Sequence, residues 1–121
     1  MSGIVENNLS ISVEEVSNVT IVHLDGRLDI LSAESLQATM SMLVDENNKI
    51  RLIINCQKLS FISSAGLCLF MIYSKKIEKR GGRLIFSAFN GTNRKIFEIT
   101  GYNKFFTVFP TIEEGIRYYN N

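Results

Sequence analysis

Apolar and polar residues alternate in the first part of the chain. In Leu9–Glu14 every second residue is apolar, which is the pattern of a half-exposed strand. Ser17-Asn18 suits a turn, and Val19–Leu24 is predicted to form a second strand, antiparallel to the first if a hairpin joins them. The pair Asp25-Gly26 is expected to end this strand, and Arg27–Leu31 to form a surface loop.

Four later segments have the spacing of helices. Ser32 is a favoured N-cap for a helix that runs to about Asp45. Ala65–Ile77 is apolar at too many positions for a strand, and it predicts a central helix. Shorter helices are expected from about Thr92 to Gly101 and from the capping box Thr111–Glu114 onward. The residues expected to face the core from these two short helices are Ile96, Phe97, Ile99, Ile112, Ile116 and Tyr119.

Unbroken apolar runs separate these helices. Leu52–Ile54 predicts a strand that is buried on both faces, followed by a polar surface loop at Asn55–Ser60. Arg83–Ala88 and Phe105–Phe109 predict two more strands, and Pro110 prevents the last from continuing. The resulting order, ββαβαβαβα, indicates an α/β fold. We expect a small mixed, mostly parallel sheet of about five strands packed by four helices, with right-handed crossovers and one antiparallel N-terminal strand.

Length and composition indicate one domain over residues 1–121, with residues 1–8 polar and expected to be flexible. Apolar residues make up 45% of the chain, enough for a core without metals or disulfides. The formal net charge is +1 with no basic stripe, which argues against a nucleic-acid partner. No segment has the length of a membrane span, and the N-terminus lacks the features of a signal peptide. Cys56 and Cys68 are interpreted as reduced thiols of a cytoplasmic protein.

Two serines, Ser63 and Ser64, stand where the central strand passes into the central helix. One interpretation is that they only cap the helix, because a serine oxygen accepts a backbone N–H that the first turn leaves unpaired. A second interpretation is a modification site. A cap needs one hydroxyl, and Ala65 and Gly66 would leave the backbone open to a partner. A phosphate is also tolerated at a helix N-terminus, where free N–H groups and the dipole favour negative charge.

Several segments resemble landmarks of one family. Leu59–Leu67 resembles the phosphorylation motif of the anti-sigma factor antagonists, small single-domain proteins of the STAS family. Gly26–Asp29, followed by Ser32–Leu36, resembles the turn before the first helix of that family, and Gly81–Leu84 and Phe97–Gly101 match in place and character. The resemblance covers nearly the whole chain and implies the STAS fold, which agrees with the fold read from the apolar pattern.

The resemblance also implies a phosphorylation-switched binding module. Aligning Gly66 with the glycine of the motif places Ser64 at the phosphorylated position, with Ser63, which stands where the family usually has Asp, as the alternative acceptor. The partner-binding residues implied are Asp29, Ser63, Ala65, Gly66 and Leu67. If Gly66 and Leu67 are uncovered, the helix start would give a small apolar contact beside the serine.

The implied partners are an anti-sigma factor that is also a serine kinase, and a serine phosphatase that resets the switch. In the unphosphorylated state the protein would bind the anti-sigma factor and so release a sigma factor. The alternative is a regulator of a kinase and phosphatase assembly without a sigma factor, and a small-ligand sensor is a third class with no pocket signature in the sequence. No membrane partner is implied, and a monomer or weak dimer is expected.

Residues for catalysis are scarce. His23 is the one histidine and lies within a predicted strand, where a structural role is expected. No metal-ligand spacing or glycine-rich phosphate loop occurs, and Ser64 lacks the Gly-x-Ser-x-Gly elbow of a serine hydrolase. The sequence therefore predicts a protein that is not an enzyme and needs no cofactor. Leu67–Tyr73 is apolar on every face, which indicates burial between the sheet and neighbouring helices, with a partner surface as the alternative.

Overall fold

The computed structural model describes residues 8–89, 91–101 and 104–121. Apart from Asn8, the segment 1–8 that was expected to be flexible lies outside the described residues. The elements, in chain order, are β1 (Leu9–Val16), β2 (Val19–Leu28), α1 (Ser32–Met40), its π-helical continuation η1 (Ser41–Glu46), β3 (Arg51–Ile62), α2 (Ser64–Lys79), β4 (Arg83–Ser87), α3 (Gly91–Thr100), β5 (Thr107–Phe109) and α4 (Ile112–Asn120).

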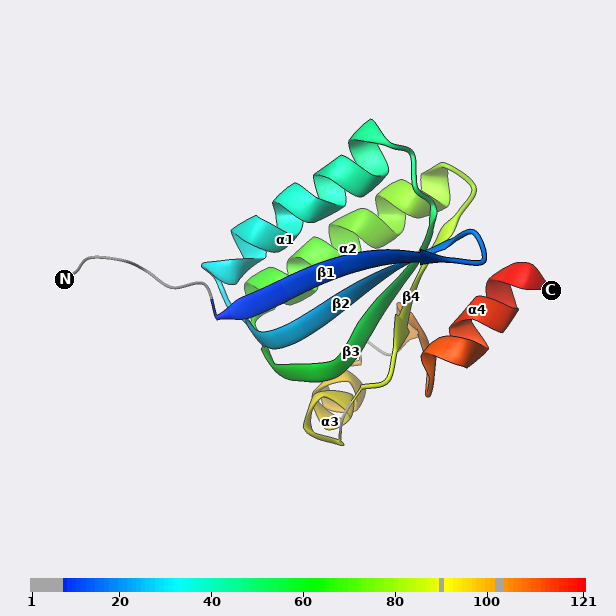
Figure 1. Ribbon diagram of the computed structural model, residues 1–121. Helices are drawn as coiled ribbons and strands as arrows, with labels where there is room; N and C mark the ends of the chain where they lie inside the picture. The colour runs from blue at the N-terminus through cyan, green and yellow to red at the C-terminus, as the bar shows by residue number, and fades with distance from the viewer. Residues whose placement is uncertain (1–7, 90, 102–103) are drawn as a thin grey trace.

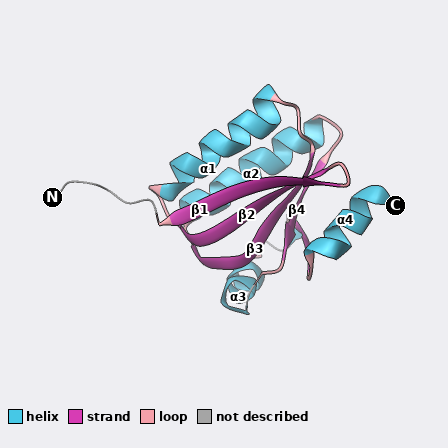
Figure 2. Cartoon of the chain, in the orientation of Figure 1, coloured by secondary structure: helices cyan, strands magenta, loops and turns pink. Residues whose placement is uncertain are grey.

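The five strands form one sheet in the order β1-β2-β3-β4-β5. β1 pairs antiparallel with β2, and the other three pairings are parallel. The predicted fold class and element order are therefore confirmed. Helices α1 and α2 lie side by side on one face of the sheet, whereas α4 lies on the other (Figures 1 and 2). No helix in the described part of the chain is long and apolar enough to cross a membrane.

Each face of the sheet has its own apolar core. The larger core joins the inner faces of α1, α2 and α3 to the sheet and includes Phe70, Phe86 and Phe97, whose rings contact one another through Phe86. The smaller core lies under α4 and contains Val19, Ile21, Ile53 and Ile85, against which the helix packs. The packing residues from α4 are Ile112, Ile116 and Tyr119, as predicted.

β2 and β3 are both longer than predicted. The pairing of β2 with β3 continues past Gly26, which pairs with Leu59, to Leu28, which pairs with Ile62. The predicted loop at 55–60 is instead part of the strand: Cys56 and Leu59 are fully buried, and the exposed pair Gln57 and Lys58 lies at a register shift in the pairing with β2. Gly26 does not end the strand. It lies at a register shift with φ +119°, and an added Cβ there would lie 2.1 Å from the Asn8 carbonyl oxygen.

The C-terminal third is less regular than predicted. β5 contains three residues, because Phe105 is 65% exposed and lies outside the sheet. Phe97 is buried as expected, but Ile99 is 83% exposed, so its predicted inward position is wrong. The side chain of Ile96 lies outside the described residues. Thr111 caps α4 as predicted, because its hydroxyl accepts the Glu114 N–H at 3.2 Å.

Candidate functional site at the start of helix α2

Ser63 is the N-cap of α2, as the sequence predicts. Its backbone is extended, with φ −83° and ψ 168°, and its hydroxyl accepts the Gly66 N–H at 3.2 Å. Its carbonyl accepts the Leu67 N–H at 3.0 Å, which is the first bond of the helix. The Ser63 oxygen is thus committed to the backbone, in the way that favours serine at this position.

Ser64 differs from its neighbour in both exposure and bonding. It is the first residue of α2 and it is exposed. Among the described residues its hydroxyl has no hydrogen-bond partner, so it is open to another molecule. The two serines are adjacent in sequence, but only Ser64 offers a hydroxyl that the fold does not use.

Gly66 and Leu67 are buried, which agrees with packing against the sheet and contradicts the alternative in which both are uncovered. A Cβ at Gly66 would lie 2.7 Å from Cγ and Cδ2 of Leu28 and 3.4 Å from Cγ2 of Ile62. Leu67 is 7% exposed and belongs to the larger core. The reason is geometric: the third and fourth residues of α2 already face the sheet, whereas Ser64 and the half-buried Ala65 face outward.

Asp29 caps the turn that leads into α1, which corrects the prediction that Ser32 is the cap. The Asp29 carboxylate accepts the N–H groups of Leu31 at 3.1 Å and Ser32 at 2.9 Å, and the Asp29 carbonyl accepts the Ala33 N–H at 2.9 Å. The Ser32 hydroxyl accepts the Asp29 N–H at 2.9 Å in return and donates to the Arg27 carbonyl at 2.7 Å. These bonds form a reciprocal cap. Ser32, the first residue of α1, is fully buried inside this cap. Its hydroxyl therefore fixes the turn and does not cap the helix.

The pKa of Asp29 lies below its ordinary value. The main cause is the Ser32 N–H, which donates to the carboxylate and favours its charged form. Partial burial opposes this shift, while the Ser32 hydroxyl, the Leu31 N–H and the Arg27 charge add to it. The carboxylate is therefore ionised at neutral pH and held in place by the cap.

The loop after β2 and the start of α2 are joined directly. The Ser63 N–H donates to the Leu28 carbonyl at 2.8 Å, one residue before Asp29. β2 and β3 end together, since Leu28 pairs with Ile62. The Asp29 loop therefore lies next to the start of the central helix.

An apolar groove runs between α1 and α2 beside Ser64. Its cavity volume is about 300 Å³, and it is lined by Ile30, Ala33, Glu34, Gln37, Ala65, Cys68, Leu69 and Ile72. Ile30 is 73% exposed and its neighbour Leu31 is 57% exposed, which is unusual for two consecutive aliphatic residues in a loop. The sequence reading missed both, although two adjacent aliphatic residues in a segment predicted as surface loop were a usable signal.

No group of metal-binding side chains is assembled in the described part of the chain. His23 has both ring nitrogens occupied, Nε2 by Glu14 at 2.7 Å and Nδ1 by Asn55 at 2.9 Å. No cluster of three His, Cys, Asp or Glu side chains among the described residues could hold a metal ion. Both cysteines are free as predicted, and burial raises the pKa of the Cys56 thiol far above its ordinary value.

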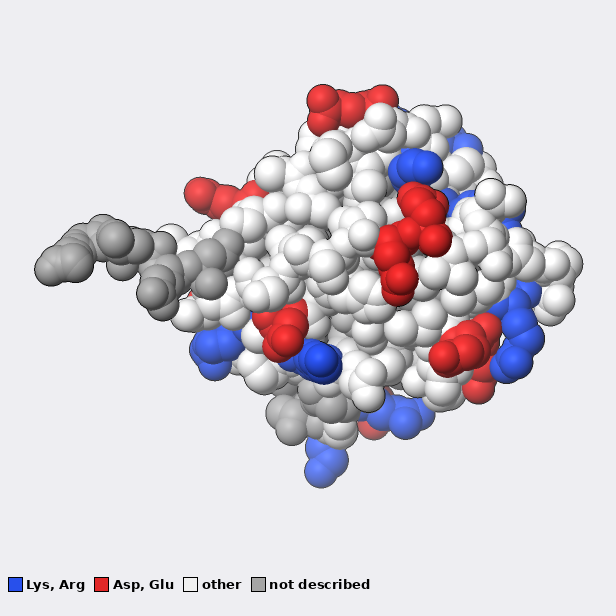
Figure 3. Space-filling model, in the orientation of Figure 1, with Lys and Arg blue, Asp and Glu red and all other residues white. Residues whose placement is uncertain are grey.

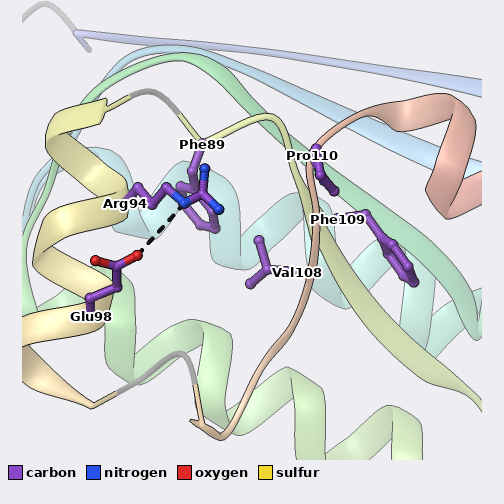
Figure 4. A pocket seen from close by; sticks show the side chains of 6 residues that line it. All are labelled: Phe89, Arg94, Glu98, Val108, Phe109 and Pro110. Carbon is purple, nitrogen blue, oxygen red and sulfur yellow. Dashed lines mark ion pairs between the residues drawn. The ribbon is translucent and has the colours of Figure 1, made fainter.

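A second cavity lies between α3 and β5 (Figure 4). Arg94 and Glu98 project into it from α3 and form an ion pair of 3.7 Å, while Phe89 and Val108 give it apolar walls. Its volume of about 210 Å³ is below the range of roughly 300–1,000 Å³ usual for small-molecule sites. It holds none of the site residues that the sequence predicted.

Comparison with known proteins gives a consistent assignment. The model of the STAS domain family matches residues 10–115. An anti-sigma F factor antagonist of Lysinibacillus sphaericus is 31% identical over 90 residues, which cover 74% of this chain and 77% of the relative.

Solved structures agree with the family match. An anti-sigma factor antagonist from Mycobacterium paratuberculosis superposes with a TM-score of 0.85 at 22% identity, over 97% of this chain and 98% of that protein. This likeness shows the fold. The Bacillus cell fate determinant SpoIIAA in its phosphorylated form is 28% identical, with a TM-score of 0.70 over 89% of this chain and 97% of that protein.

Proposed function

Because this chain belongs to the STAS domain family, we propose that it is an anti-sigma factor antagonist that phosphorylation of Ser64 switches off. One observation carries the choice of residue: the Ser64 hydroxyl is exposed and unbonded at the start of α2, beside an apolar groove. Similarity to antagonists, one of them solved in a phosphorylated form, supports the class of function.

The bonding of the two serines favours Ser64 as the acceptor. Phosphorylation of Ser63 would turn the hydroxyl oxygen that accepts the Gly66 N–H into a weakly accepting ester oxygen, so the cap of α2 would have to rearrange. Phosphorylation of Ser64 breaks no bond recorded in the described residues. A phosphate there still lies close to the positive end of the helix dipole, which favours its charge.

The partner would dock on the surface formed by Ser64, Ala65 and the exposed loop residues Ile30 and Leu31. Asp29 and Ser63 contribute by holding these residues in place through their caps. Gly66 and Leu67 support this surface from inside the fold, because both residues pack against the core. The implied set of five residues is therefore retained, but four of them, Asp29, Ser63, Gly66 and Leu67, act by positioning the surface and only Ala65 contacts the partner.

The switch follows from the charge of the phosphate. A phosphoserine adds about −1.5 to −2 charges at pH 7. Docking an apolar surface around that group would require its desolvation, which costs free energy unless the partner supplies paired cations. Since about 1.4 kcal/mol is a tenfold change in affinity, a penalty of several kcal/mol is enough to release the partner. No change of fold is needed.

The proposed partner is an anti-sigma factor that is itself a serine kinase, and a serine phosphatase resets the switch. We expect the protein to act in the cytoplasm, as a binding module and not as an enzyme. Affinity purification from its own cells tests this scheme. A kinase recovered together with a sigma factor supports it, and a kinase recovered without one indicates the alternative assembly.

Phosphate mapping tests the site. The protein is incubated with the recovered kinase and ATP, and the phosphate is located by fragmentation mass spectrometry. We expect it on Ser64. Ser64→Ala should then bind the kinase constitutively, and Ser64→Asp should bind it poorly, with Ser12→Ala as a matched control for an exposed serine. Phosphate on Ser63, or on neither serine, would contradict the assignment.

A further inference from the structure

Two arginines lie side by side at the other end of the sheet. Arg51 opens β3 and Arg83 opens β4, and the two residues are register partners in the parallel pairing of these strands. Residues in register on neighbouring strands point to the same face. Here that is the face covered by α4, because Ile53 and Ile85, two residues further along each strand, belong to the core beneath α4.

Neither guanidinium has a carboxylate partner among the described residues. The Arg51 Nη2 donates to the Tyr119 carbonyl and to the Asn120 side-chain oxygen, both at 2.6 Å, at the end of α4. The Arg83 Nη1 donates to the neutral hydroxyl of Thr107 at 3.1 Å. Like charges directly opposite on paired strands are destabilising. The helix end offsets part of the Arg51 charge, whereas nothing recorded in the described residues offsets that of Arg83.

One hydrogen-bond donor of Arg51 is also left without a partner. The Nε of Arg51 is buried and has no hydrogen-bond partner among the residues that the structure describes. Buried polar atoms are nearly always bonded, and an exception calls for an explanation such as a bound ion. The donor belongs to a cation, for which an unpaired buried position is particularly costly.

Both arginines line one cleft. Its volume is about 460 Å³, and its walls are Ile50, Arg51, Gly81, Gly82, Arg83, Tyr118 and Tyr119. An added Cβ at Gly81 would meet nothing within 4 Å, so the loop leaves the cleft open. Lysine and arginine side chains gather along the right margin of Figure 3, where the C-terminal ends of α2 and α4 lie in Figure 1.

We propose that this cleft binds a phosphoryl group, as free phosphate or as the ester of a small molecule. A phosphate monoester carries about −1.5 to −2 charges at pH 7 and so matches two guanidinium groups, whereas a carboxylate would match only one. Arginine is also the side chain best suited to phosphate, because its planar donors bind two oxygens at once. The ring of Tyr118, which is 43% exposed, gives the cleft a wall for the organic part of an ester. This inference does not depend on the proposed role of Ser64.

Titration of the folded protein with inorganic phosphate, followed by two-dimensional NMR at constant ionic strength, tests the proposal. We expect saturable shifts of the backbone amides of Arg51, Gly81 and Gly82. Arg83→Gln should weaken binding at least tenfold, because it removes a charge-assisted contact. Lys75→Gln, which removes an exposed cation that does not line the cleft, is the matched control and should bind as the unmodified protein does.

Phenyl phosphate and acetate are two further test ligands. The first distinguishes a phosphate ester from free phosphate, and the second tests whether the cleft prefers a phosphoryl group. Phenyl phosphate binding more tightly than inorganic phosphate would indicate an ester, and the reverse would indicate free phosphate. Acetate binding as well as phosphate would overturn the phosphoryl assignment. Absence of saturable shifts in the unmodified protein, or an equal loss in Arg83→Gln and Lys75→Gln, would overturn the site. The shift map needs no variant, so the proposal can fail even if Arg83→Gln is unstable.

Discussion

The starts of α1 and α2 lie next to each other, but they use their polar side chains differently. At α1, the Asp29 carboxylate and the Ser32 hydroxyl bond each other's backbone, and both groups are committed. At α2, Ser63 caps the helix alone and Ser64 is left unused. A closed helix start holds a loop in a fixed shape, while a start with a spare hydroxyl can be modified without loss of structure. The comparison separates the capping residues Asp29, Ser32 and Ser63, which stabilise this end of the molecule, from Ser64, whose hydroxyl is available for modification.

The largest effect is expected at Gly66. Gly66→Arg would force a Cβ to within 2.7 Å of the Leu28 side chain and place a charge against the larger core. We expect a loss of at least about 3 kcal/mol in the free energy of unfolding, measured by urea denaturation. Ala65→Arg is the matched control, since the neighbouring residue lines the groove: it should fold cooperatively and lose partner binding. A stable Gly66→Arg protein would show that α2 can move away from the sheet.

Asp29 comes next. Asp29→Ala removes the acceptor of two backbone N–H groups, and we expect the melting temperature to fall by on the order of 5 °C. Asp29→Asn should recover most of that loss, because asparagine caps as well as aspartate does. If Asp29→Ala melts as the unmodified protein does but no longer binds its partner, the carboxylate is a contact residue and not a cap.

The Asp29 pair of variants also predicts a pH dependence. The folded-state pKa of Asp29 is lowered, so its stabilisation is complete above the ordinary pKa of 3.8 and is lost as the pH falls through the lowered value. Below about pH 4 the unmodified protein should therefore lose its advantage over Asp29→Asn. Melting curves of the two proteins between pH 7 and pH 2.5 measure this. Parallel curves across that range would contradict the assignment of the shift to the cap.

Ser63→Ala is expected to have a smaller effect. It removes one capping bond, to the Gly66 N–H, and should cost about 0.5–2 kcal/mol of stability. Phosphorylation of Ser64 should persist in this variant, because the helix is also held by its apolar face. Loss of phosphorylation with the free energy of unfolding unchanged would show instead that the kinase recognises Ser63.

Ser64→Ala should change stability least, within about 0.5 kcal/mol, since the hydroxyl is exposed and makes no recorded bond. Denaturation of Ser63→Ala and Ser64→Ala side by side tests the contrast between the adjacent serines directly. Equal losses in the two variants would mean that both hydroxyls serve the fold.

Features with a local cause could be predicted from the sequence. The N-cap at Ser63 and the cap at Thr111 depend on neighbouring residues, and both were found. The extension of β3 to Ile62 could not be predicted, because the consecutive exposed residues Gln57 and Lys58 break the apolar pattern of the strand. Pairing with the end of β2, which is far away in sequence, decides that segment.

The candidate site was predicted in part for the same reason. The position of Ser63 and Ser64 between an apolar run and a helix indicated a candidate site, and the resemblance to the family motif singled out Ser64. The burial of Gly66 could not be decided from the sequence, since it depends on Leu28 lying across the helix start. The residue type of Ser32 predicts an N-cap, but the Asp29 carboxylate accepts the Ser32 N–H and caps the turn instead. The sequence predicts only a surface loop for Ile30 and Leu31, whose exposure places them on the proposed docking surface.

The order of the strands has a consequence for synthesis. Each strand pairs only with strands that are adjacent to it in sequence, from β1 to β5. During translation, which adds about 5–20 residues per second, every new strand therefore meets a completed edge, and no strand has to insert between two that are already paired. The sheet can grow in one direction as the chain leaves the ribosome, and α2 with its serine can pack on three finished strands before β4 is made.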